Sequence, residues 1–128
     1  MKSFLIALAL LLSACAPLQS RDGDVTLRAE RTSPQQIRIT LHNGSDAPAG
    51  YNLCTAVLEN DTGTTWSQVR TDEVCTMEIR TLAAGESATF DKTLPAGLQP
   101  GNYRYLANVE VPLGTPQTGI ASNSFAIP

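Results

Sequence analysis

The sequence predicts an all-β protein, an antiparallel β-sandwich of seven or eight short strands. Apolar and polar residues alternate with a period of two from residue 25 onward, which is the pattern of strands with one buried face. Turn residues interrupt this alternation about every 8 to 12 residues, a spacing typical of sandwiches. No apolar stripe of helical period and useful length follows residue 24. A small closed barrel would show the same alternation, so this pattern alone leaves both architectures open.

Four strands are predicted in the first half of the domain. Residues 25–31 and 37–43 each present three apolar side chains to one face. Residues 51–59 are apolar on both faces, which predicts one continuous central strand covered on each side. A hairpin turn at residues 60–63 then pairs residues 64–69 back, with Trp66 available for packing. The side chains expected on the inner faces of the first two strands are Val25, Leu27, Ala29, Ile37, Ile39 and Leu41.

Four further strands are predicted in the second half. Residues 74–82 are expected to form a strand with Cys75, Met77 and Ile79 on one face. Residues 87–94 and 101–111 repeat the alternation, and residues 119–127 provide the closing strand. The inner faces of these last three strands are expected to carry Ala88, Phe90, Leu94, Tyr103, Tyr105, Ala107, Val109, Val111, Ala121, Phe125 and Ile127.

The first fifteen residues predict the location of the protein. Lys2 precedes an apolar run over residues 4–12, which is followed by small residues, as in a secretory signal. This run is too short to span a bilayer, which needs about 20 apolar residues. Residues 12–15, Leu-Ser-Ala-Cys, resemble the lipobox of bacterial lipoproteins, in which the cysteine is lipidated and the preceding peptide removed. The alternative is a secreted protein whose signal happens to end beside a cysteine.

The lipobox resemblance divides the chain into three parts. Residues 1–14 are the expected signal peptide, residues 15–24 the lipidated Cys15 with a tether, and residues 25–128 the sandwich domain. Several acyl chains on Cys15 would anchor the protein stably in a membrane. Ala16 rather than Asp after the cysteine resembles the outer-membrane sorting pattern of enteric bacteria. The eight residues 17–24 of the tether reach at most about 26–29 Å, so the domain is expected close to the membrane of the cell envelope.

The two remaining cysteines, Cys54 and Cys75, predict one disulfide in an oxidising compartment. A zinc site would need further ligands, and His42 is the only histidine. The CxxC spacing of redox enzymes is absent, so we expect neither a metal nor another cofactor. Without Lys2 the chain carries 8 basic against 12 acidic side chains, about −4, and no basic stripe. This charge distribution argues against nucleic acid and against electrostatic binding to anionic lipid.

Residues 98–105, LQPGNYRY, resemble the L-x-P-G-x-Y form of the tyrosine corner in immunoglobulin-like sandwiches. The resemblance implies that Tyr103 bonds to upstream backbone and that Pro100 and Gly101 form the turn. The two domain cysteines are too close in sequence for the antibody-type bridge between sheets. We therefore expect Cys54 on the third strand and Cys75 at the start of a strand one hairpin later, so that the bridge holds that neighbouring segment.

The mature chain resembles the immunoglobulin-like domains of bacterial lipoproteins and other envelope proteins. The residues that carry the resemblance are NGSDAPAGYNLC, Trp66, VCTMEIRTLAAGESATF, LPAGLQPGNYRY and SNSFAIP. The resemblance implies an immunoglobulin-like sandwich that binds or spaces other components of the envelope. A weaker similarity connects the chain to a proteinase-inhibitor family from bacilli, which has the same fold and an LxxGxY corner.

No catalytic constellation is visible in the sequence. His42 lies at a turn, with no nucleophile or orienting partner that the sequence can place beside it. We therefore expect a non-enzymatic, envelope-anchored module that binds or spaces another component. Trp66 and Tyr51, with Tyr105, are candidates for an exposed patch that contacts an envelope protein or a glycan. The alternative is a proteinase inhibitor that presents residues 114–119 to a protease.

Overall fold

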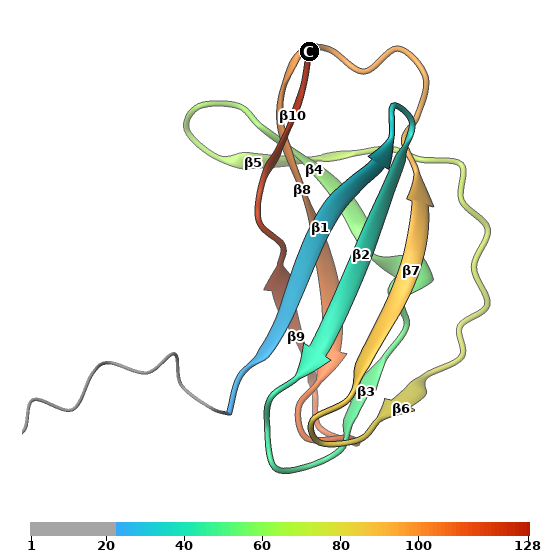
Figure 1. Cartoon of the computed structure of the whole chain (residues 1–128), viewed down its shortest axis with the longest axis vertical. Coiled ribbons are helices and arrows are strands. Elements are labelled where there is room, and N and C mark those ends of the chain that lie inside the picture. Colours follow the sequence, from blue (N-terminus) through green and yellow to red (C-terminus); the bar gives the residue numbers. More distant parts are fainter. Residues whose placement is uncertain (1–22) are drawn as a thin grey trace, which may run out of the picture.

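Two antiparallel sheets pack face to face in the computed structural model, which describes residues 23–128 (Figure 1). The smaller sheet has the order β1 (Val25–Ser33), β2 (Gln36–Asn43), β7 (Ser87–Thr93). The larger sheet has the order β5 (Trp66–Val69), β4 (Val57–Asp61), β8 (Gly101–Glu110), β3 (Ala49–Tyr51), β6 (Arg80–Leu82), and β8 also pairs with β9 (Gln117–Ala121) and β10 (Phe125–Ile127).

This arrangement confirms the predicted all-β sandwich, because the strands form two separate sheets and do not close into a barrel. The strand order corresponds to that of an immunoglobulin-like sandwich. The described residues contain ten strands rather than seven or eight, because two of the predicted strands are each divided in two. No helix in the described part of the chain is long and apolar enough to cross a membrane. The expected signal peptide, the lipidated Cys15 and most of the tether lie outside the described residues.

The core lies between the two sheets and follows the period-two alternation. Ile37, Ile39 and Leu41 on β2 are completely buried, as the sequence predicts. Across the small sheet Ile39 pairs with Ala29 on β1 and with Phe90 on β7, so these residues share the inner face. Burying one such side chain contributes about 1.5–3 kcal/mol. The larger sheet contributes buried residues of β8 to the same core, namely Tyr103, Tyr105, Ala107 and Val109.

The single strand expected at residues 51–59 does not form. A 3₁₀-helix, η1 (Leu53–Thr55), separates β3 from β4, although both strands pair with β8. The Thr55 hydroxyl donates to the Asn52 carbonyl oxygen at 2.8 Å, and the Thr55 backbone N–H donates to the same oxygen at 3.2 Å. A local bond from a Thr side chain to the backbone competes with a ladder of backbone hydrogen bonds. The apolar pattern therefore led to a wrong prediction here, and Cys54 lies on η1 between the two strands.

The closing strand expected at residues 119–127 is divided into β9 and β10. The intervening Asn123 lies against β1 of the other sheet. The Ala29 N–H donates to Asn123 Oδ1 at 2.8 Å, and Asn123 Nδ2 donates to the Ala29 carbonyl at 3.0 Å. The side-chain amide thus satisfies the edge of β1 as a neighbouring strand would, which favours the interruption.

The tyrosine-corner hydrogen bond is present. Tyr103 on β8 is 2% exposed, and its hydroxyl donates to the carbonyl oxygen of Gln99 at 2.6 Å. Gly101 at the start of β8 has a φ of 154°, which glycine adopts readily. Pro100 precedes it directly. The bond ties the turn between β7 and β8 to the core.

Replacing Tyr103 by phenylalanine removes this hydrogen bond and keeps the buried ring. We expect the free energy of unfolding to fall by about 1 kcal/mol, the usual net contribution of one hydrogen bond. Urea unfolding measures the change. Tyr51→Phe is the matched control, because Tyr51 is half-buried and its hydroxyl donates no hydrogen bond within the described residues. Equal stability of the wild type and Tyr103→Phe would contradict a stabilising corner.

Candidate binding site

An extended segment of ten residues connects β5 to β6 and runs beside β7 (Figure 1). We call residues 70–79 the strap. It was expected to form a strand from residue 74, but the structure assigns strand only from Arg80, and no turn or bend interrupts the strap. Of the side chains expected on one face of this strand, Met77 is 85% exposed and Ile79 is 42% exposed. Val74 on the strap is 96% exposed. The strap therefore presents apolar side chains to solvent.

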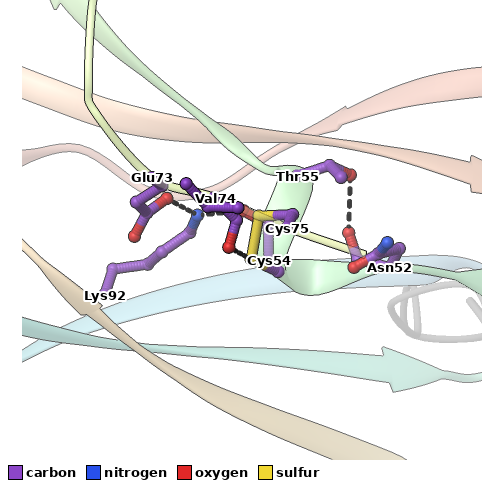
Figure 2. A network of polar contacts seen from close by, with 7 residues as sticks. All are labelled: Asn52, Cys54, Thr55, Glu73, Val74, Cys75 and Lys92. Atoms are coloured by element: carbon purple, nitrogen blue, oxygen red, sulfur yellow. Dashed lines mark hydrogen bonds and ion pairs between the residues drawn. A yellow bond between two sulfur atoms is a disulfide. The ribbon is translucent and has the colours of Figure 1, made fainter. Parts of the chain in front are cut away.

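The strap is fastened to η1 by the predicted disulfide. Cys54 on η1 and Cys75 on the strap are bonded, with 5.8 Å between their Cα atoms (Figure 2). One residue further, Asn52 Nδ2 donates to the Thr76 carbonyl oxygen at 2.6 Å. The bridge therefore holds a neighbouring segment, as expected, although Cys54 lies on a 3₁₀-helix and Cys75 lies outside any strand. These bonds replace the strand pairing that the sequence predicted for this segment.

A buried lysine provides a third point of attachment. Lys92 lies on the inner face of β7 and is 1% exposed. Its Nζ donates to Glu73 Oε2 of the strap and to the carbonyl oxygen of Cys54, both at 2.6 Å (Figure 2). The rings of Phe90 and Tyr105 lie 5.5 and 5.7 Å from Nζ. The charge is therefore buried but paired, hydrogen-bonded and flanked by aromatic rings.

Lys92 was not among the site residues predicted from the sequence. Its position was nevertheless a signal, because it alternates with the inner residues Ala88 and Phe90 of the same predicted strand. A lysine at an inner position is almost never fully buried unless it is paired. Its partner Glu73 belongs to a segment whose predicted strand began one residue later, so the pair could not be recognised.

The same ion pair affects Tyr105. Burial raises the pKa of the Tyr105 phenol far above its usual range, and the charge of Glu73 raises this pKa further. The neutral phenol thus binds its proton more tightly in the folded than in the unfolded state. The stabilisation that comes from this tighter binding of the phenol proton is complete below the unfolded pKa of about 10. It is lost as the pH rises above that value.

We expect the wild-type protein to lose stability between about pH 9 and pH 11 more steeply than Tyr105→Phe does, because only the wild-type residue can release a proton on unfolding. Urea unfolding at several pH values measures both slopes. Parallel curves for the wild type and Tyr105→Phe would contradict this linkage.

A groove of about 320 Å³ is lined by the disulfide, the strap, the β3–η1 segment and β7. Tyr51 and Phe90 contribute aromatic walls, and Thr89 contributes the edge of β7. Glu78 and Arg80 also line the groove and carry opposite charges. Arg80 pairs directly with Tyr51 across β3 and β6, so both side chains lie on the same face of the larger sheet. The groove thus combines apolar walls with a few polar groups, as small binding sites do.

Trp66 and Tyr51, which were expected to share an exposed patch, lie on opposite faces of the larger sheet. Tyr51 pairs with Val109, which is completely buried, so Tyr51 faces inward. Asn60 pairs with Tyr103 and therefore faces inward. Its neighbour Asp61 faces outward, and so does Trp66, which pairs with Asp61. Tyr105, the third candidate, is buried in the core. The aromatic residues therefore do not form one patch.

Trp66 is half-buried on the outer face of the larger sheet. The guanidinium carbon of Arg104 lies 4.2 Å from the centre of its ring. Arg104 Nε also donates to Glu59 Oε1 at 2.8 Å, with both side chains largely covered. The indole therefore stacks on an ion pair of its own sheet, which is a stabilising arrangement.

Two other candidates have local roles in the structure. His42 Nδ1 lies 2.8 Å from Ser87 Oγ, and both residues are exposed and paired across β2 and β7. The 114–119 segment is not a free loop, because β9 begins at Gln117 and pairs with β8. Among residues 23–128 no group of three or more His, Cys, Asp or Glu side chains is arranged to hold a metal ion.

Comparisons with known proteins find similarity among solved structures. No protein-family model matches the chain, and no curated protein matches it. Among solved structures, the chain is similar to the crystal structure of the putative ApaA protein from Bordetella pertussis. The TM-score is 0.48 with 18% sequence identity, and the alignment covers 80% of this chain and 88% of that chain.

Proposed function

We propose that this protein is a non-enzymatic lipoprotein of the bacterial cell envelope whose immunoglobulin-like domain binds a protein partner through the strap. Cys15 anchors it in the membrane, the outer membrane where there are two. The lipobox-like residues 12–15 and the short polar tether support the anchor. The tether reaches at most about 26–29 Å, so the partner is sought among proteins near the membrane surface.

The observation that carries the binding role is the way the strap presents Val74. This side chain is 96% exposed, and the residues on either side of it are both attached to the domain, Glu73 through Lys92 and Cys75 through the disulfide. An apolar side chain held in this way loses little conformational entropy when a partner covers it. Single exposed apolar residues are common on protein surfaces, but the strap also carries Met77, which is 85% exposed, and larger exposed apolar surfaces mark interaction sites.

The anchor is tested by labelling cells with an alkyne fatty acid and isolating the protein. We expect label on the wild type, with the protein in the membrane fraction, and neither in Cys15→Ser. The control variant is Ser13→Thr, which keeps Cys15. Cys54→Ser would be unsuitable as a control because it breaks the disulfide. A wild-type protein that is unlabelled and soluble in the periplasm or the medium would contradict the anchor.

The binding role is tested with a photo-crosslinking amino acid at position 74 or 77 in native envelopes, followed by mass spectrometry. We expect both positions to crosslink to the same protein. The matched control is position 28, because Arg28 is also exposed but lies on β1, away from the strap. Crosslinks that are identical from all three positions, or that reach only lipid, would contradict binding through the strap.

A proteinase inhibitor is the second candidate, and the extended conformation of the strap favours it. Extended chains can pair with the sheet edge of a partner protein, so residues 73–77 are better suited to such a role than residues 114–119, half of which belong to β9. Incubation with a panel of secreted proteases at stoichiometric excess decides the question. Undiminished activity of every protease would exclude this candidate.

A further inference from the structure

The edge of β7 that faces the groove has free backbone groups. The Asn43 N–H donates to the Glu86 carbonyl at 2.9 Å, and the Leu94 N–H donates to the Gln35 carbonyl at 2.7 Å. The register between β2 and β7 is continuous between these two bonds. Residues 88, 90 and 92 therefore bond to β2, and the N–H and C=O groups of residues 87, 89 and 91 point to the opposite side.

No strand covers this edge in the described residues, because β7 is the last strand of the smaller sheet. The strap runs beside it but is attached to the Lys92 side chain and to η1, and not to the backbone of β7. A groove remains between the two, with Thr89 on one side and Thr76 on the other. An unpaired strand edge is a template for pairing with another chain.

The other walls of the groove determine what kind of chain fits. Tyr51 and Phe90 form an apolar region, which suits an apolar side chain. Glu78 and Arg80 have opposite charges, so they give no net preference for a charged ligand. A volume of about 320 Å³ lies at the lower end of the range for ligand sites, about 300–1,000 Å³, and so has room for few side chains.

We propose that this groove binds an extended, uncharged, apolar segment of a partner protein, which adds to β7 as a further strand. Main-chain bonds to Thr89 and its alternate neighbours provide the pairing, and one apolar side chain of the segment lies between Tyr51 and Phe90. This inference rests on the proposed binding function and adds the chemical nature of the partner segment. The strap then forms the outer wall of the site, and the disulfide closes one end.

The test uses the ¹⁵N-labelled full chain in detergent and the blocked peptide acetyl-TVTVT-amide. We expect saturable changes in the amide signals of residues 87, 89 and 91 that exceed those of residues 88, 90 and 92. The controls are two versions of this peptide, each N-methylated at the alternate backbone nitrogens that face one of its two edges. One version can still donate hydrogen bonds to β7, and the other cannot. We expect that peptide to bind at least tenfold more weakly and the affinity to change little with salt.

The outcomes separate this inference from the proposed function. Equal binding of both methylated peptides, or no binding of the unmodified peptide, would overturn strand addition. Equal binding of acetyl-valine-amide would identify a small-molecule pocket and would also overturn it. If crosslinks from positions 74 and 77 to one protein persist in either case, binding through the strap stands and only the groove occupant is wrong. The variant Thr89→Pro, which removes one free edge N–H, should weaken peptide binding and leave those crosslinks unchanged.

Discussion

Replacing Glu73 by alanine is expected to lower the free energy of unfolding by about 3 kcal/mol. The substitution leaves the Lys92 ammonium 1% exposed with one remaining oxygen partner, the Cys54 carbonyl. Breaking a buried ion pair from one side costs about 3–5 kcal/mol, and the value here is at the lower end because Glu73 is 29% exposed. Urea unfolding monitored by tryptophan fluorescence and by circular dichroism measures the loss.

The reverse substitution, Lys92→Met, is the informative comparison. It removes the buried charge and keeps a long apolar side chain, while Glu73 is exposed enough to be hydrated. We expect a loss of only about 1 kcal/mol, and the double variant Lys92→Met with Glu73→Ala should be more stable than Glu73→Ala alone. A Glu73→Ala protein as stable as the wild type would show that the pair does not hold the strap.

Removing the disulfide is the second change with a large expected effect. The double variant Cys54→Ala, Cys75→Ala frees a loop whose ends are 21 residues apart, and we expect it to lose about 3 kcal/mol of stability. The strap should then exchange its amide hydrogens faster, because Asn52 and Lys92 alone attach it. Urea unfolding and hydrogen exchange of residues 73–77 measure the two effects.

The disulfide and the ion pair should be coupled, because they attach adjacent parts of the strap. Without the bridge Glu73 is less well positioned, so Glu73→Ala should cost less in the cysteine-free protein than in the wild type. Non-reducing gels of the single variants Cys54→Ala and Cys75→Ala control for aberrant disulfide crosslinks. Fully additive losses would contradict a strap that is held as one unit.

Period-two alternation was sufficient to predict β1, β2, β7 and β8, because the inner faces of these strands are mostly apolar, with the buried Asn43 on β2 and Lys92 on β7 as polar exceptions. It failed where side chains bond to the backbone. The Thr55 side chain bonds to the Asn52 backbone and stabilises η1 inside an apolar run, and the Asn123 side chain divides the closing strand by bonding to the other sheet. Such bonds depend on residues that are distant in sequence or on local geometry, which alternation does not report.

The candidate site was predicted only in part. The bridge between Cys54 and Cys75 followed from the number of cysteines, and its role in holding a nearby segment followed from their spacing. The faces of Tyr51 and Trp66 could not be predicted, because they depend on strand register and on the break at η1. Lys92 required knowledge of Glu73, whose position is set by the disulfide rather than by a strand.

The strap lies beside β7 and leaves the edge of this strand free for a partner. Amide hydrogen exchange along β7 measures whether the edge is free. Residues 87, 89 and 91 are expected to exchange much faster than residues 88, 90 and 92, which bond to β2. The bound peptide is expected to slow the exchange of the first group only. Equal protection of both groups in the free protein would show that the edge is already paired and would contradict binding of a partner strand to β7.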